Sequence, residues 1–190
     1  MIMAPNNKII LGIDPGSNLL GYAFIQLIQS KKPRIIRMGA LDMRSIDKHS
    51  EKLSFIYKEL SKLIHIYAPS EAAIEAPFYS KNVQSMLKLG RAQGAAMLAV
   101  SNAGIQIAEY SPKSVKKAVT GTGNAAKEQV ARMFPNIIEG EIDQKVLDAT
   151  DALGVAYCHY IQSKGLGPNK KKHNDWAGFL KENPGRKAKL

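Results

Sequence analysis

Four acidic residues of this sequence lie beside or within apolar segments, where a carboxylate without a partner is costly. Asp14 ends an apolar run that covers residues 9–13, and a Pro-Gly turn follows it directly. Glu75 ends a second, shorter apolar stretch. Asp148 and Asp151 are three residues apart in a segment with helical periodicity, so their side chains share one face of a helix. These four carboxylates are the candidates for chemistry in this chain.

The two acids of the helical segment favour a bound cation. The face that they share continues through Val155 and Cys158, so it is otherwise apolar and is expected to pack on a sheet. Two like charges on such a face repel each other and resist desolvation, and a divalent cation removes both costs. Together, the four acids fit a two-metal site for phosphodiester cleavage, in which one ion polarises the attacking water and the other stabilises the departing 3′ oxygen. Taken singly, each acid also has an ordinary explanation, as a turn cap or as a charge near a helix terminus.

Apolar runs and helical periodicities predict the elements that position these acids. Short apolar runs bounded by turn residues predict strands, and apolar residues three and four apart predict amphipathic helices. The predicted strands are 8–14, 21–25, 34–41, 72–75 and 105–108. The predicted helices are 53–67, 80–102, 112–119, 125–134 and 145–162, with a polar loop at 135–143. Three strands in a row, then alternating helices and strands, indicate a single α/β domain with a mixed sheet flanked by helices.

The charge balance favours a polyanionic partner. The chain has 27 Lys and Arg residues against 16 Asp and Glu, a formal net charge of +11. Such a surplus is typical of proteins that bind nucleic acid or an anionic membrane surface. Residues 164–190 hold eight basic and two acidic residues, so we separate a basic tail, 164–190, from a domain that covers 1–163. With no membrane-length apolar run, no signal-peptide pattern and a single cysteine, we expect a cytoplasmic protein that does not enter a membrane.

Four short stretches occur in an order that indicates a family. They are Ile10–Tyr22 with its Asp-Pro-Gly-Ser turn, Ala73–Glu75, Lys81–Gly90 and Asp148–Leu153. Together they resemble the RuvC family of Holliday-junction resolvases. The resemblance implies an RNase-H-like fold, a homodimer, Mg²⁺ as cofactor with Mn²⁺ as a substitute, and a four-way DNA junction as substrate. It also implies paired phosphodiester incisions in homologous recombination and DNA repair, with branch-migration proteins as further partners.

Position in these motifs assigns family roles to individual residues. The acids that match the family's catalytic, metal-binding carboxylates are Asp14, Glu75, Asp148 and Asp151. Lys116 and Lys127 match the family's basic residues near the DNA, and Phe78 matches its aromatic residue near the junction centre. The local pattern adds neighbours, because lysines cluster around the turn at 121–123 and Tyr79 follows Phe78. The expected DNA contacts are Phe78, Tyr79, Lys81, Lys113, Lys116, Lys117 and Lys127.

Three other functions stay open at the level of the sequence. An ATPase or sugar kinase of the actin-like class also has an Asp-x-Gly turn after its first strand, but it needs two such lobes, and a chain of 190 residues is short for two. A non-catalytic nucleic-acid-binding module explains the charge and leaves the four acids unexplained. An RNase-H-like nuclease of other specificity shares both the predicted fold and the acids.

Overall fold

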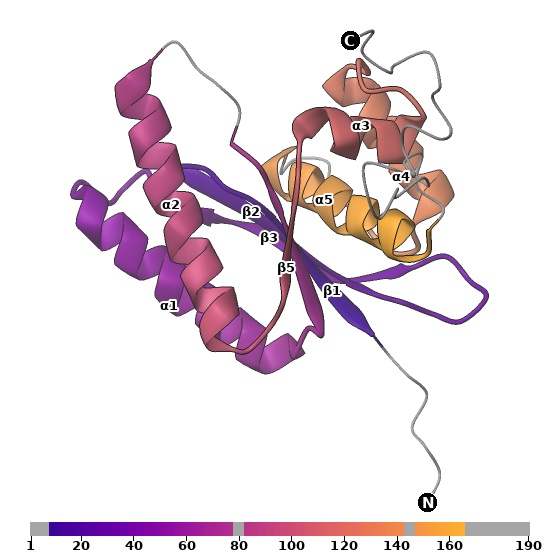
Figure 1. Ribbon diagram of the computed structural model, residues 1–190, viewed down its shortest axis with the longest axis horizontal. Helices are drawn as coiled ribbons and strands as arrows, with labels where there is room; N and C mark the ends of the chain where they lie inside the picture. The colour runs from indigo at the N-terminus through magenta and orange to yellow at the C-terminus, as the bar shows by residue number, and fades with distance from the viewer. Residues whose placement is uncertain (1–7, 78–81, 143–146, 166–190) are drawn as a thin grey trace, which may run out of the picture.

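The centre of the molecule is a sheet of five strands in the order β3-β2-β1-β4-β5 (Figure 1). The computed structural model describes residues 8–77, 82–142 and 147–165, and at 147 and 148 it describes the backbone alone. The strands are β1 Ile9–Asp14, β2 Leu19–Gln26, β3 Arg34–Asp42, β4 Glu71–Glu75 and β5 Ile107–Tyr110. β1, β2 and β3 form an antiparallel meander, whereas β4 pairs parallel with both β1 and β5. The mixed sheet that the sequence predicts is confirmed.

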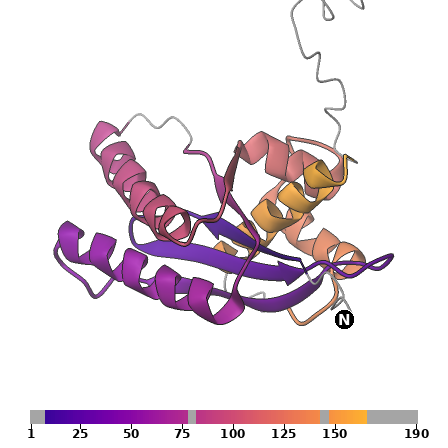
Figure 2. The same ribbon diagram turned by 60° about the horizontal axis from the view of Figure 1, so that its bottom comes forward.

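Helices cover both faces of this sheet (Figures 1 and 2). Their bounds are α1 His49–Tyr67, α2 Val83–Asn102, α3 Pro112–Thr120, α4 Lys127–Ile137 and α5 Leu147–Ser163. α1 and α2 lie on one face, and α5 lies on the other with α3 and α4 beside it. In the described part of the chain, no helix is long and apolar enough to cross a membrane.

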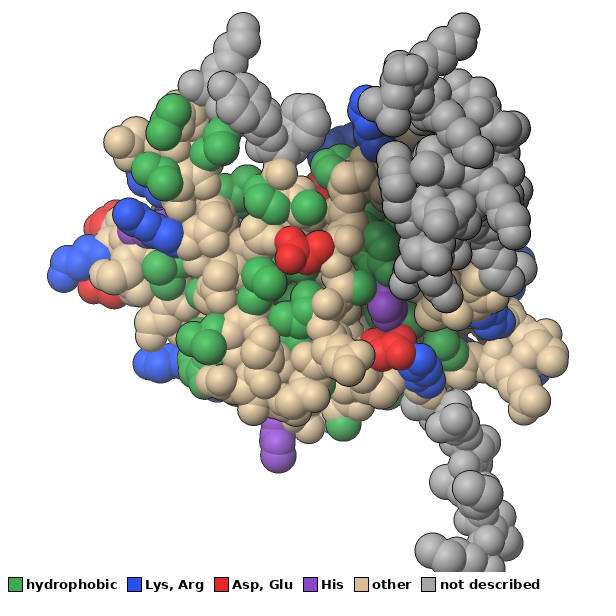
Figure 3. Space-filling model, in the orientation of Figure 1, with side chains coloured by type: hydrophobic (Ala, Val, Ile, Leu, Met, Phe, Trp, Pro, Cys, Tyr) green, Lys and Arg blue, Asp and Glu red, His purple; other side chains and the backbone are tan. Residues whose placement is uncertain are grey.

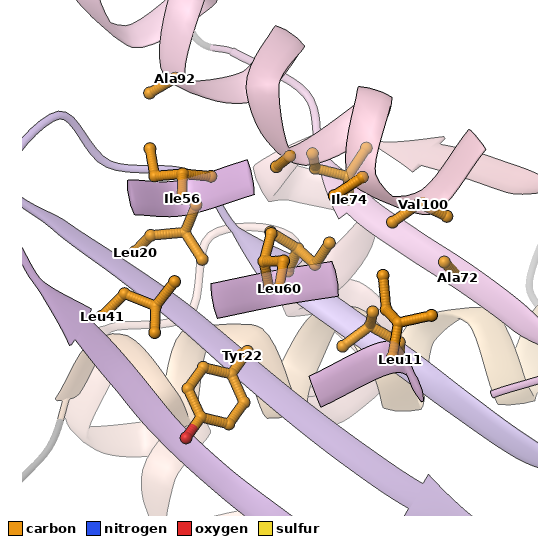
Figure 4. Packing of buried hydrophobic residues seen from close by; sticks show 14 of the residues in the cluster. Leu11, Leu20, Tyr22, Leu41, Ile56, Leu60, Ala72, Ile74, Ala92 and Val100 are labelled. Carbon is orange, nitrogen blue, oxygen red and sulfur yellow. The ribbon is translucent and has the colours of Figure 1, made fainter. Parts of the chain in front are cut away.

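An apolar layer on each face holds the helices to the sheet. Successive residues of a strand point to opposite faces, so β1 supplies both layers. Leu11 packs in the layer under α1 and α2, together with Ile56 and Leu60 of α1 (Figure 4). Ile10 packs in the layer on the other face, against Leu153 of α5. All five side chains are fully buried, and each contributes about 1.5–3 kcal/mol through removal of apolar surface from water.

Gly12 lets α5 approach β1 closely. A Cβ atom at this position would lie 2.3 Å from the carbonyl oxygen of Ala152 and 2.6 Å from the amide nitrogen of Ala156. Both atoms belong to the backbone of α5, so a larger residue would push the whole helix away from the sheet. The missing side chain therefore brings the part of α5 that carries Asp151 close to β1.

A series of polar contacts also fixes α5 to the sheet. Tyr110 Oη lies 2.8 Å from His159 Nδ1, and His159 Nε2 lies 3.0 Å from Glu71 Oε2. Lys8, just before β1, forms an ion pair with the other carboxylate oxygen of Glu71. Burial, followed by the neighbouring Cys158 and Glu71, raises the pKa of Tyr110 to about 12, so its phenol stays neutral and can donate a hydrogen bond. These contacts give His159 a structural role.

Some element boundaries differ from the sequence-based predictions. One difference is at the end of α4, which continues to Ile137 where the sequence predicts a polar loop from residue 135. Phe134 and Ile138 are both buried, and their packing keeps the last turn helical although Pro135 lies within it. The other shifted elements are α1, which begins at His49, α2, which begins at Val83, and β5, which covers Ile107–Tyr110.

Candidate active site

Asp14 and Glu75 end neighbouring strands at one edge of the sheet. β1 and β4 are parallel, and Ile13 pairs with Ile74, so the next residue on each strand is the acid. Both acids line one cavity of about 150 Å³, whose wall includes Gln93 of α2. The structure therefore brings these two predicted acids together where the sheet opens to solvent.

Glu75 also lines a second cavity, of about 280 Å³, on the side of α3, α4 and α5. This cavity is walled by Lys116 of α3, Lys127 of α4, and Thr150 and Asp151 of α5. Glu75 therefore lies between the cavity that holds Asp14 and the cavity that holds Asp151 and two lysines. Carboxylates and ammonium groups from four other elements, β1, α3, α4 and α5, line the two cavities beside this one side chain, which makes it the centre of the candidate site.

The charged form of Glu75 is disfavoured by its surroundings. Burial first, and then the negative charge of Asp151, raise the pKa of its carboxyl from the ordinary 4.5 to about 7. Lys127 and Lys116 act in the opposite direction and do not compensate. A strongly shifted carboxyl in a cavity is typical of functional sites, because positive charge brought by a ligand restores its ionised form.

Asp151 forms an ion pair across the second cavity. Lys127 Nζ donates to Asp151 Oδ2 at 2.6 Å, and both side chains remain partly exposed to solvent. Among the side chains that the structure describes, which do not include Asp148, no three His, Cys, Asp or Glu residues are grouped closely enough to hold a metal ion. The donor set still fits a divalent cation, because Glu75 and Asp151 offer carboxylate oxygens whose mutual repulsion a cation would relieve.

Comparison with known proteins identifies the family of this chain. The family model described as crossover junction endodeoxyribonuclease RuvC matches residues 10–159. The chain belongs to the RuvC family. It is 50% identical over 178 residues to the RuvC of Cytophaga hutchinsonii, covering 94% of this chain and 87% of that protein. It is 46% identical over 188 residues to the RuvC of Bacteroides fragilis, covering 98% and 99% of the two chains.

Solved structures agree with this family assignment. RuvC of T. thermophilus in complex with a Holliday junction substrate superposes with a TM-score of 0.77 at 28% identity, covering 83% of this chain and 96% of that one. The yeast mitochondrial Holliday junction resolvase Ydc2 superposes with a TM-score of 0.65 over 94% and 85% of the chains. At 14% identity, the yeast enzyme shows a shared fold alone. The RNase-H-like fold expected from the RuvC resemblance is confirmed.

The structure separates the predicted DNA contacts of this RuvC-family chain into three groups. Lys116 and Lys127 line the cavity beside Glu75. Lys113 and Lys117 are exposed on α3 and are not among the residues that line it. The third group, which consists of Phe78, Tyr79 and Lys81, lies outside the described residues, as does the basic tail from residue 166 onward. Asp148 is on the first turn of α5, and its side chain lies outside the described set.

Sequence reasoning missed Gln93 and Thr150, which line the two cavities. Gln93 is 6% exposed and donates a hydrogen bond of 3.3 Å to Glu109 Oε2 on β5. It lies between the buried residues Ala92 and Ala96 on the face of α2 that packs on the sheet. A polar residue in such an apolar stripe is the signal that could have identified it.

Replacing Glu75 with glutamine should raise the melting temperature of the metal-free protein above pH 7. The Glu75 pKa of about 7 in the folded chain exceeds its ordinary 4.5, so the folded state holds this proton more tightly than the unfolded state. Wild-type stability should therefore fall as the pH rises from 4.5 to about 7, by at most about 3 kcal/mol in total. Glutamine carries no charge and avoids this loss. Thermal denaturation of both proteins in EDTA, from about pH 4.5 to about pH 8, measures the difference.

The matched control for this experiment is Glu59→Gln on α1. Glu59 pairs with Lys62 on the surface, and such pairs contribute about 1 kcal/mol or less. The Glu59→Gln substitution should change the melting temperature only slightly, and this change should not grow above pH 7. Equal melting temperatures for wild type and Glu75→Gln at every pH would contradict the raised Glu75 pKa.

Proposed function

We propose that the chain is a structure-selective endonuclease that resolves four-way DNA junctions by Mg²⁺-dependent phosphodiester cleavage, in homologous recombination and DNA repair. The observation that carries this proposal is the position of Glu75, between Asp14 on one side and Asp151 with two lysines on the other. Carboxylates that could bind a metal ion and ammonium groups that could bind a phosphate thus lie together at one edge of the sheet in a RuvC-family chain. A family member from T. thermophilus has been solved with a Holliday junction substrate, which supports the choice of DNA.

Four acids would hold the metal in this proposal: Asp14, Glu75, Asp148 and Asp151. When bound, two Mg²⁺ ions, for which Mn²⁺ can substitute, supply an activated water and stabilise the departing 3′ oxygen. The chain's own residues orient the substrate. Lys116 and Lys127 present ammonium groups at the cavity wall, where they would donate to phosphate oxygens. Because Lys127 pairs with Asp151 in this structure, its ammonium group would exchange that carboxylate for a phosphate when DNA binds.

Cleavage of a synthetic four-way junction tests this proposal. The purified protein should cut the junction when Mg²⁺ is present and should leave linear duplexes of the same sequence intact. An RNA–DNA hybrid serves as a third substrate, because preference for the hybrid would favour an RNase-H-like nuclease of other specificity. No cleavage of any substrate would favour the non-catalytic binding module. The cytoplasmic location and the branch-migration partners stay predictions.

We also propose that the enzyme is a homodimer joined through α2. Apolar and glycine residues on one face of this helix, which we call the α2 stripe, are Val83, Leu87, Gly90, Gly94 and Leu98. The three larger side chains are 50–65% exposed, and a Cβ atom at either glycine would meet no atom within 4 Å apart from the adjoining backbone of α2 itself. Their spacing of three and four places them on one face, which a second copy could cover about a two-fold axis. Resolution of a junction needs two symmetry-related incisions, and each chain carries one candidate site.

Leu87→Glu should convert this dimer to a monomer. Leu87 is 50% exposed, so the variant should fold, but each protomer would lose an apolar contact and gain a charge at the seam. Loss of about 1.5–3 kcal/mol on each side of a symmetric interface raises the dissociation constant at least about a hundredfold. Sedimentation velocity across a dilution series measures the change. Ile66→Glu on α1 is the control, because Ile66 is 67% exposed outside the stripe. A wild-type monomer at concentrations that cut junctions would contradict the dimer.

A further inference from the structure

A second group of basic side chains lies on the α1 and α2 face of the sheet. It consists of Lys52 from α1 and Lys88 and Arg91 from α2, gathered around His49 at the start of α1. We call it the α1–α2 basic cluster. Figure 3 shows Lys and Arg side chains beside a histidine in this region, at the left edge of the view. The sequence-based DNA contacts do not include these residues.

The cluster belongs to the same edge of the sheet as the candidate active site. Lys52 Nζ donates at 2.7 Å to the side-chain oxygen of Asn18, which lies in the turn that follows Asp14. The backbone carbonyl of Asn18 accepts a hydrogen bond of 2.8 Å from the Met43 amide, just after β3. On the α2 side, the helix begins at Val83, only eight residues after Glu75 ends β4. The α1–α2 basic cluster and the lysines of α3 and α4 therefore flank the carboxylates from opposite faces of the sheet.

Two of the three cations in this cluster form no ion pair within the described residues. No ion pair among them involves Lys88 or Arg91, both of which are exposed. Glu51, the acid in the first turn of α1, pairs with Lys48 at 3.4 Å instead. Lys88 and Arg91 thus present two cations of α2 to solvent without an ion pair to any described residue.

The three cations lie close to the ring of His49 and therefore close to one another. Burial first, and then the charges of Arg91, Lys88 and Lys52, lower the pKa of His49, so three cations from two helices act on one ring. The Nε2 atom of His49 is buried and has no hydrogen-bond partner among the described residues. A ring held neutral in this way adds no further positive charge beside the three cations, of which Lys88 and Arg91 are exposed to solvent.

We propose that the α1–α2 basic cluster binds the phosphate backbone of one duplex arm of the junction as that arm leaves the active site. This inference rests on the proposed function, because it needs a DNA substrate at the carboxylates. A duplex arm carries regularly spaced phosphates and no sequence information on its backbone, which suits exposed cations such as Lys88 and Arg91, which form no ion pair among the described residues. With Lys116 and Lys127 on the other face, the DNA would be held on both sides of the bond that is cut.

The double variant Lys52→Gln with Lys88→Gln tests this inference against a control of equal charge. The control is Lys31→Gln with Lys32→Gln, because these exposed lysines lie in the β2–β3 loop, at the opposite edge of the sheet from Asp14. Junction affinity is measured in Ca²⁺ over a series of salt concentrations. Each phosphate contact contributes about 0.9 to the slope of log affinity against log salt, so the cluster variant should lose about 1.8. Its affinity deficit relative to wild type should therefore change about twelvefold between roughly 50 and 200 mM salt.

The outcomes separate this inference from the proposed function. A reduced slope for the cluster variant alone supports the inference. A wild-type slope for the cluster variant overturns it, and so does an equal reduction in the control variant, which would show diffuse electrostatic attraction. If wild-type protein cuts junctions while either of these contrary results holds, the proposed function stands without the cluster. If wild-type protein neither binds nor cuts junctions, the proposed function has failed, and the inference fails with it.

Discussion

Glu75→Gln should lower the rate of junction cleavage about a thousandfold and leave junction affinity close to that of the wild type. The substitution keeps the shape of the side chain and removes a charge that the proposed metal site needs. A metal ion supplies several kcal/mol of transition-state stabilisation, and loss of about 4 kcal/mol corresponds to about a thousandfold in rate. Single-turnover cleavage and binding in Ca²⁺ measure the two effects separately. The same result is expected for Asp14→Asn, Asp148→Asn and Asp151→Asn.

Two comparisons separate a catalytic effect of these four substitutions from a general effect on the protein. Binding should survive, because the proposed phosphate contacts come from lysines such as Lys116 and Lys127 rather than from the acids. Glu59→Gln, which removes a carboxylate from the surface of α1, should leave the cleavage rate unchanged. Any of the four acid variants that cuts junctions at near wild-type rate would lose its place in the catalytic site.

Removal of divalent metal should abolish cleavage, and Ca²⁺ should restore binding without restoring turnover. Mg²⁺ keeps a tight octahedral shell, whereas Ca²⁺ accepts more ligands at longer distances, so Ca²⁺ would misplace the attacking water. We expect a loss of at least about a thousandfold in rate with EDTA. A titration of Mg²⁺ or Mn²⁺ into metal-free protein, followed by single-turnover cleavage, measures the recovery.

The pH dependence of the Mg²⁺ requirement gives a second test of the metal prediction. Protonation of Glu75 competes with the cation, because burial and the charge of Asp151 raise the Glu75 pKa to about 7. More Mg²⁺ should therefore be needed for half-maximal cleavage at pH 6 than at pH 8. Full activity in EDTA at either pH would contradict the metal hypothesis.

The sequence predicts the part of the site that local patterns determine. Asp14 and Glu75 each end an apolar run, and such runs become central strands of a sheet. Ile13 and Ile74 then pair in parallel, which makes the two acids neighbours. The glycine at position 12 belongs to the same local pattern, although its role as the contact point for α5 appears only in the structure. Fold class and the first two acids follow from these features.

The rest of the site depends on how distant helices dock, which local patterns do not determine. The ion pair of Lys127 with Asp151 requires α4 and α5 to pack side by side. The end of α4 was predicted wrongly, because burial of Phe134 and Ile138 outweighs the helix-breaking tendency of Pro135. The position of Glu75 between two cavities is likewise a product of tertiary packing. The α1–α2 basic cluster joins residues about 40 positions apart in the chain and could not be identified from charge alone.

Cleavage of a supercoiled plasmid that extrudes a cruciform tests the central claim most directly, because the cruciform is a four-way junction. One incision relaxes the plasmid to a nicked circle, whereas two paired incisions across the junction produce linear DNA. With Mg²⁺, we expect linear product to appear as fast as supercoiled plasmid disappears, with little nicked circle, and a plasmid without the cruciform to stay intact. Accumulation of nicked circles without linear product, or equal cutting of both plasmids, would contradict this claim.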